Sequence, residues 1–114
     1  MPEQCTTIEL NKDYSRDEIE AIKMGIGDVP NDDKWFVDYD KSNNKLRMHR
    51  QLTGYCIYVV QFEENKEKGS FTAKTVIVNR DSSQYTGNND EEDKLTVSML
   101  MDRVILEHTV QKQD

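Results

Sequence analysis

The fold of this chain is decided by residues 46–60, which read LRMHRQLTGYCIYVV. Residues that favour β-strands stand at both ends of this stretch, and Thr53-Gly54 between them supplies turn formers. The stretch therefore predicts two antiparallel strands, at residues 45–51 and 55–62. It also holds one of the two histidines and one of the two cysteines, so reactive side chains are concentrated where the strands are.

Two further strands are predicted on either side of this stretch. Residues 34–40 read KWFVDYD and residues 71–79 read FTAKTVIVN, both rich in aromatic and β-branched side chains. The four strands together predict an antiparallel meander. The two ends of the chain, residues 1–14 and 110–114, are expected to be flexible, with at most a short edge strand at residues 6–10.

One helix is predicted before the sheet and one after it. Ser15 and Glu18 form a capping-box pattern, so a short helix is expected over residues 16–24. Asn88-Asn89 is followed by an acidic turn, which the helix dipole favours, and this predicts a longer helix over residues 90–107. The predicted fold is a single α+β domain with the order α-β-β-β-β-α.

Alternation along the strands assigns a core face, because side chains two residues apart point to the same side of a sheet. The core face is expected to collect Trp35, Val37, Tyr39, Leu46, Met48, Tyr55, Ile57, Val59, Phe71, Ala73 and Ile77. The opposite face is expected to carry Phe36, Asp38, Arg47, His49, Cys56, Tyr58, Val60, Phe62, Thr72, Lys74, Val76 and Val78. The assignment assumes no bulge, since a shift of one residue inverts a strand.

The last predicted helix has apolar residues on two opposite sides. At about 100° per residue, one side carries Val97, Leu100, Met101, Val104 and Ile105. The other side carries Leu95, Met99 and Leu106. Either the N-terminal helix covers this second side, or it is a surface for a homodimer or a protein partner.

The charge of the chain excludes some partners. Fifteen lysines and arginines against 22 aspartates and glutamates give a net charge of −7, which disfavours nucleic acid and anionic membranes. No basic segment followed by an apolar one opens the chain, and no apolar run reaches the ~18–20 residues that span a bilayer. We therefore expect a cytoplasmic protein with Cys5 and Cys56 reduced.

Charged and aromatic side chains near the ends of the predicted strands form the candidate ligand site. Strand ends and the loops after them are common binding positions, and arginine offers a planar fork for carboxylate or phosphate. The candidate ligand-binding residues are Arg47, His49, Arg50, Thr53, Tyr58, Arg80, Asp81 and Tyr85. Such a group predicts recognition of an anionic or nucleotide-like ligand.

A catalytic role would centre on His49, which could act with Cys56 or Tyr58 if Asp38 or Tyr58 fixed its tautomer. A cysteine on a central strand is more typical of a small core residue. His108 is explained as a favourable partner of a helix C-terminus. Because no close pairing such as C-x-x-C or H-x-x-x-H is present, we expect no metal and no cofactor.

These residues give the chain a resemblance to a family of small uncharacterised bacterial proteins. Its members carry a W-F...L-x-x-H-R-x-x-T-G-x-C-I-Y core, an N-R-D...Q-Y loop and a D-R pair in a closing helix. The matching positions here are Trp35-Phe36, Leu46, His49-Arg50, Thr53-Gly54, Cys56-Ile57-Tyr58, Asn79-Arg80-Asp81, Gln84-Tyr85 and Asp102-Arg103. The resemblance covers residues 34–107 and departs at Gln51-Leu52, where the family often has Ser-Trp. Some members occur beside ADP-ribosylglycohydrolase-like domains, which implies a nucleotide-like ligand but no mechanism.

Three functions remain open on this basis. The favoured one is a small non-catalytic binding or accessory module. The second is an acidic immunity-type inhibitor of a basic toxin or nuclease, whose sign would be a contiguous acidic patch. The third is a small enzyme that uses His49 with Cys56 or Tyr58.

Overall fold

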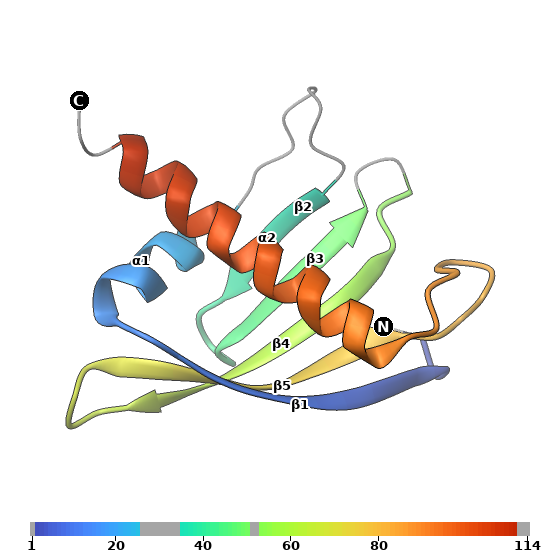
Figure 1. The fold of residues 1–114 in the computed structure, drawn as a ribbon, viewed down its shortest axis with the longest axis horizontal. Helices are drawn as coiled ribbons and strands as arrows, with labels where there is room; N and C mark the ends of the chain where they lie inside the picture. The colour runs from blue at the N-terminus through green and yellow to red at the C-terminus, as the bar shows by residue number, and fades with distance from the viewer. Residues whose placement is uncertain (1, 26–34, 51–52, 112–114) are drawn as a thin grey trace.

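The computed structural model describes residues 2–25, 35–50 and 53–111 of the chain, which form one antiparallel sheet and two helices (Figure 1). The strands are β1 (Cys5–Tyr14), β2 (Trp35–Asp40), β3 (Lys45–Arg50), β4 (Cys56–Asn65) and β5 (Ser70–Asn79). The helices are α1 (Arg16–Met24) and α2 (Asp90–Gln111). The α+β class is confirmed, but the sheet has five strands rather than four. Two predicted strand ends, Lys34 and Gln51, lie outside the described residues.

The fifth strand is β1, which comes from residues expected to be flexible apart from a possible short edge strand at residues 6–10. The strand order is β1-β5-β4-β3-β2, so β2 to β5 form the predicted meander and β1 pairs with β5 at its edge. Residues 11–13 read NKD, a sequence unfavourable for strands, and Asn11 has a positive φ of 50° at a register shift. Pairing with β5 overrides this local preference, and Ile8 and Tyr14 are buried on either side of the irregularity.

Both helices contribute to a core on one face of the sheet, and α2 crosses that face diagonally (Figure 1). The capping box of α1 is present as predicted, since Ser15 Oγ accepts from the Glu18 backbone N–H at 3.2 Å and Glu18 accepts from the Ser15 N–H at 2.9 Å. The residues that the helices bury in the core are Ile19, Ile22, Val97, Leu100, Met101 and Val104. Helix α2 extends to Gln111, beyond the predicted end at Glu107.

Two register shifts reverse the predicted inner face of β4 and of half of β5. Between β3 and β4, His49 lies opposite Cys56 whereas Met48 lies opposite Tyr58. A second shift, between Gln61 and Phe62, lies opposite Lys74. The side chains that enter the core are therefore Tyr58, Val60, Phe62, Val76 and Val78, all predicted on the other face.

The same shifts correct the predicted core residues. Tyr55 was expected inside but is 42% exposed, and Ile77 is only partly buried. Val59 lies opposite Arg47 on the face that neither helix covers. Ile57 stays in the core, because it is the extra residue at the first shift.

Candidate functional site

A buried carboxylate at the start of α2 gathers three of the predicted site residues. Asp93 is 2% exposed and accepts hydrogen bonds from Arg80 at 2.5 Å and from the Tyr85 hydroxyl at 2.7 Å. The Tyr58 hydroxyl lies 3.0 Å from the same carboxylate oxygen and 2.9 Å from the Tyr85 hydroxyl. The hydroxyls of Tyr58 and Tyr85 have two protons between them. These two protons are shared among three short oxygen–oxygen contacts, one between the hydroxyls and one from each hydroxyl to Asp93. We call Tyr58, Arg80, Tyr85 and Asp93 the Asp93 cluster.

The guanidinium of Arg80 is hydrogen-bonded to three acceptors of the chain itself. Besides Asp93, it donates to Asp90 at 2.8 Å and to the carbonyl of Gly87 at 3.0 Å. Burial lowers the pKa of Arg80, but its hydrogen bonds to Asp93 and Asp90 outweigh burial and raise that pKa overall. Two carboxylates of the chain already pair with this arginine and would compete with an external anion.

The two tyrosines of the Asp93 cluster are held as neutral hydroxyls. Burial is the largest cause that raises the pKa of Tyr58, and the neighbouring Tyr85 and Asp93 raise it further. Burial also raises the pKa of Tyr85. Both side chains therefore act as hydrogen-bond donors and not as bases or nucleophiles.

Arg50 and Thr53 lie at the same end of the sheet as Arg80, where β3 turns into β4. The Arg50 guanidinium lies 5.0 Å from the ring centre of Trp35, which stacks on Tyr58 at 5.6 Å. Thr53 accepts from the backbone N–H of Tyr55 at 3.3 Å, so its hydroxyl stabilises the turn between β3 and β4.

The carboxylate of Asp81 is hydrogen-bonded within its own turn. Its carboxylate accepts from the Ser83 hydroxyl at 2.7 Å and from the Ser83 backbone N–H at 3.0 Å. These hydrogen bonds hold the pKa of Asp81 below its usual value. The carboxylate therefore fixes the loop after β5.

Arg47 and His49 lie on the opposite, uncovered face and share one carboxylate. Asp38 on β2 accepts from Arg47 through Nη2 at 2.7 Å and Nε at 3.2 Å, and from His49 Nε2 at 3.1 Å. The hydrogen bond to Asp38 raises the pKa of Arg47. Asp38, not Tyr58, thus fixes the His49 ring, which also meets Phe36 at a ring distance of 5.7 Å.

Cys56 lies opposite His49 in the strand register but remains a thiol. Burial is the largest cause that raises its pKa, and the thiol donates weakly to the Tyr58 carbonyl at 3.6 Å. Cys5 pairs with Asn79 of β5, so the two cysteines lie two strands apart, roughly 9–10 Å. This separation exceeds disulfide reach, in agreement with two free thiols.

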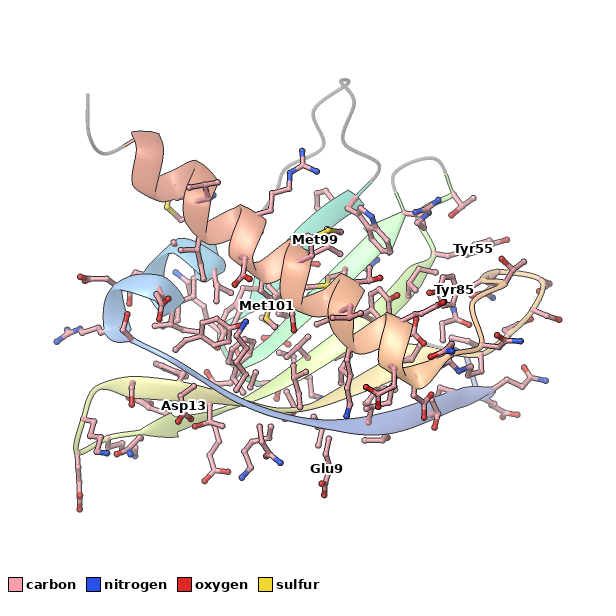
Figure 2. All side chains as sticks on the ribbon, in the orientation of Figure 1. Glu9, Asp13, Tyr55, Tyr85, Met99 and Met101 are labelled. Carbon is pink, nitrogen blue, oxygen red and sulfur yellow. The ribbon has the colours of Figure 1, made fainter. Side chains whose placement is uncertain are left out.

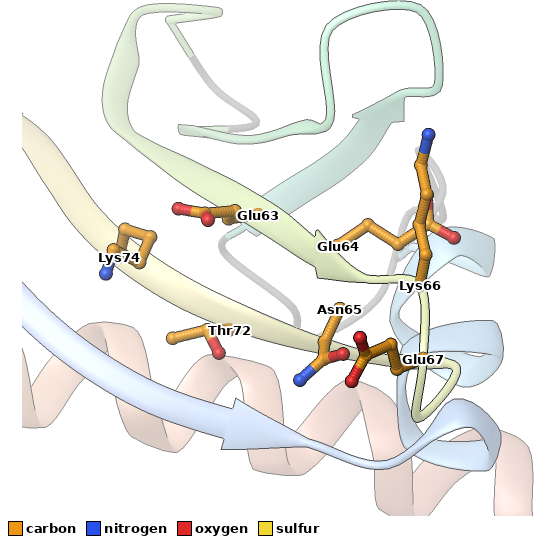
Figure 3. Close-up of a pocket in the computed structure, with 7 residues that line it drawn as sticks. All are labelled: Glu63, Glu64, Asn65, Lys66, Glu67, Thr72 and Lys74. Carbon is orange, nitrogen blue, oxygen red and sulfur yellow. The ribbon is translucent and has the colours of Figure 1, made fainter.

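The eight predicted site residues therefore do not meet in one pocket. A hollow of about 450 Å³ exists instead at the β4–β5 hairpin (Figure 3). It is lined by Glu63, Glu64, Asn65, Lys66, Glu67, Thr72 and Lys74, none of which was a predicted site residue. Among the described residues, no group of three His, Cys, Asp or Glu side chains is arranged to hold a metal ion.

The most unusual exposed surface is the outer side of α2. Leu95 is 71% exposed, and Met99 and Leu106 are each 62% exposed, whereas Met101 of the same helix is buried (Figure 2). The expectation that the N-terminal helix covers these residues is therefore wrong. We call Leu95, Met99 and Leu106 the α2 strip.

Sequence reasoning missed Asp93, which it treated only as part of an acidic first turn. A signal was present, because Asp93 falls on the same side of the helix as Val97, Leu100 and Val104 at helical spacing. A carboxylate on an apolar side predicts a buried charge, which requires a partner such as Arg80.

Within the described parts of the chain, no helix combines the length and the apolar character needed to cross a membrane. The chain matches no protein-family model, no curated protein and no solved structure.

Proposed function

We propose that this protein is a cytoplasmic, non-catalytic accessory module that binds another protein through the α2 strip. The supporting observation is that α2 is apolar on two opposite sides and that only one of them is buried. Aligned apolar side chains that remain in water are typical of interaction surfaces. The strip extends from Leu95 to Leu106, or about 17 Å of helix, enough for several contacts with a partner.

The chemistry of the other candidate residues supports binding rather than catalysis. A nucleophilic cysteine needs a lowered pKa, whereas burial raises the pKa of Cys56. The hydroxyls of Tyr58 and Tyr85 are neutral for the same reason. His49 is hydrogen-bonded to Asp38, which is already shared with Arg47.

The pairing of the arginines also favours a protein partner over an anionic or nucleotide-like ligand. Arg47 and Arg80 each hold a carboxylate of this chain. A phosphate would compete with those carboxylates, so its net gain would be small. The side chains of the α2 strip, in contrast, are 62–71% exposed.

Site-specific photo-crosslinking tests the proposal. A photoreactive phenylalanine analogue is introduced in place of Met99 and, as a matched control, in place of Tyr55, which is also a large exposed side chain. We expect cells that produce the protein to yield a crosslinked adduct of defined mass from position 99 only. The adduct should disappear when Leu95→Ser and Leu106→Ser are added.

Absence of an adduct at position 99, or the same adducts from both positions, would contradict docking at the α2 strip. Circular dichroism of each variant provides the control for folding. Because the substituted side chains are exposed, each change should alter the free energy of unfolding by less than about 0.5 kcal/mol.

A further inference from the structure

We propose that Met99 is a reversible oxidation site that switches docking at the α2 strip, an inference that rests on the proposed function. The chain has five methionines, of which Met24, Met48, Met99 and Met101 lie in its described parts. Met99 is 62% exposed, whereas Met48 and Met101 are fully buried. Met101 follows Met99 by only two residues, but helical spacing turns it to the inner side of α2 (Figure 2). A dissolved oxidant therefore reaches the sulfur on one side of this helix and not on the other.

The reaction is a two-electron oxidation of the thioether by a hydroperoxide, with hydrogen peroxide as the simplest case. The sulfur lone pair of Met99 attacks one peroxide oxygen, so an S–O bond forms while the O–O bond breaks. The second oxygen leaves as hydroxide and becomes water by taking the proton of the transferred hydroxyl group. The sulfur is oxidised to a sulfoxide and the peroxide is reduced to water. A thioether has no proton to lose, so access to solvent decides which methionine reacts.

Met99 lies within the row of apolar side chains that would meet a partner. Leu95 precedes it by four residues and Leu106 follows it by seven, spacings that keep the three side chains on one side of α2. Oxidation replaces the apolar thioether with a polar sulfoxide. A partner that covers the oxidised strip must remove the sulfoxide oxygen from water, and the two leucine side chains offer it no hydrogen bond. Docking therefore weakens although both leucines are unchanged.

The fold tolerates oxidation at this position. The inner side of α2 is held by Val97, Leu100, Met101 and Val104, which are all buried in the core. An oxygen added to Met101 would enter that close-packed core, whereas one added to Met99 stays in water. Because the sulfoxide at Met99 remains exposed on a folded helix, a methionine sulfoxide reductase can return it to the thioether.

Met24 provides a matched control within the same chain. It is also 62% exposed, but it lies at the end of α1 and is not part of the α2 strip. Peroxide should oxidise Met24 and Met99 together, and only the change at Met99 should affect docking. The variants M24L and M99L separate the two effects, since leucine keeps an apolar side chain of similar size that peroxide does not oxidise.

Peptide mass mapping of the full chain after treatment with hydrogen peroxide tests the chemistry. We expect Met24 and Met99 to gain one oxygen each while Met48 and Met101 stay reduced. Methionine sulfoxide reductases should restore Met99. A thiol reductant alone, which reverses oxidation of the exposed Cys5, should not. Oxidation of Met48 or Met101 as fast as that of Met99 would overturn the selective site without touching the proposed function.

Photo-crosslinking from Leu95 tests the switch, because the photoreactive analogue at that position leaves Met99 native. The purified protein, oxidised and freed of peroxide, is mixed with cell extract. Oxidation should lower the yield of the adduct at least about fivefold, and the reductases should restore it. M99L should keep the adduct after peroxide, whereas M24L should lose it as the wild type does. M99Q should give a low yield without peroxide, since the glutamine it introduces is polar like the sulfoxide.

The outcomes separate the switch from docking itself. An undiminished yield from oxidised wild-type protein, or an equal loss from oxidised M99L, would overturn the switch, while the adduct from the reduced protein would still support docking. An adduct from position 99 but none from Leu95 would show that the strip does not act as one surface, which also overturns the switch. If the reduced protein gives no adduct from either position, the proposed function fails and the switch fails with it.

Discussion

Replacement of Asp93 by asparagine should destabilise the protein far more than the same change at Asp90. Both carboxylates accept a hydrogen bond from Arg80. The side chain of Asp93 is 3% exposed, whereas that of Asp90 is 59% exposed. The two variants share the partner Arg80, but Asp93 is buried and also accepts from Tyr58 and Tyr85, whereas Asp90 is exposed.

The expected size follows from the contacts of the Asp93 cluster. Removal of one member of a buried ion pair typically costs about 3–5 kcal/mol. The asparagine introduced by D93N would keep one acceptor oxygen, and Asp90 and the Gly87 carbonyl would still hold Arg80. We therefore expect D93N to reduce the free energy of unfolding by about 2–3 kcal/mol. D90N removes an exposed pair and should cost about 0–1 kcal/mol.

Urea unfolding followed by tryptophan fluorescence measures both variants. Trp35 is the single tryptophan of the chain and stacks on Tyr58, so its emission reports on the Asp93 cluster directly. The slope of the unfolding free energy against urea should stay constant while the midpoint moves. Losses for D93N and D90N that agree within about 0.5 kcal/mol would refute the stabilising role given to Asp93 in its buried cluster.

A double-mutant cycle with Y58F tests the shared hydrogen bonds. Y58F alone should cost about 0.5–1.5 kcal/mol, because one buried hydroxyl contact is lost. In the D93N background the additional cost should differ by at least about 0.5 kcal/mol, since the two side chains touch. Strict additivity would show that Tyr58 and Asp93 act separately.

The register shift, a glycine and the two cysteines each give a further prediction. In urea unfolding, V60A should reduce the free energy of unfolding by about 1–3 kcal/mol and Y55A by less than about 0.5 kcal/mol, because Val60 is buried and Tyr55 is exposed. Unbroken alternation predicts the reverse ranking, and that ranking would contradict the register shift in β4. G25A should reduce the free energy of unfolding by about 3 kcal/mol or more in thermal unfolding, because Gly25 has a φ of 65° and an added Cβ would overlap a carbonyl oxygen of β2. A loss near 1 kcal/mol would show that this contact relaxes. At about pH 8, iodoacetamide should modify Cys5 before Cys56, because the raised pKa of Cys56 reduces its thiolate fraction, and peptide mass mapping that finds the reverse order would refute this. The raised pKa also means that the contribution of Cys56 to stability is present below about pH 9 and declines above it, as the unfolded thiol ionises first.

Local signals in the sequence predicted the local parts of the fold. The Ser15 and Glu18 pattern predicted where α1 begins, since its hydrogen bonds involve only neighbouring residues. The order of β2 to β5 followed from alternation and turn residues. The full length of β1 beyond residues 6–10 could not be predicted in the same way, because β5, which lies far along the chain, supplies its hydrogen bonds.

The candidate site was predicted only where neighbouring strands decide it. Arg47 and His49 meet Asp38 because β2 and β3 form a hairpin, and the register of a hairpin is a local property. Helical spacing places Asp93 on the apolar side of α2, but its contact with Tyr58 depends on how α2 crosses the sheet, which no local pattern predicts. The register shift at Ile57 turned Tyr58 toward Asp93 and away from His49, so one inserted residue separated the two halves of the predicted cluster.

Helix α2 is fastened to the rest of the molecule at both ends. Near its start, Asp93 accepts hydrogen bonds from Tyr58 of the sheet and from Arg80 of the loop after β5. Near its end, His108 donates through Nε2 to the carbonyl of Gly25 at 2.9 Å. A helix anchored in this way keeps its shape whether or not anything touches its outer side. A partner would then lose little conformational entropy in ordering this surface, so contacts of modest area could give useful affinity.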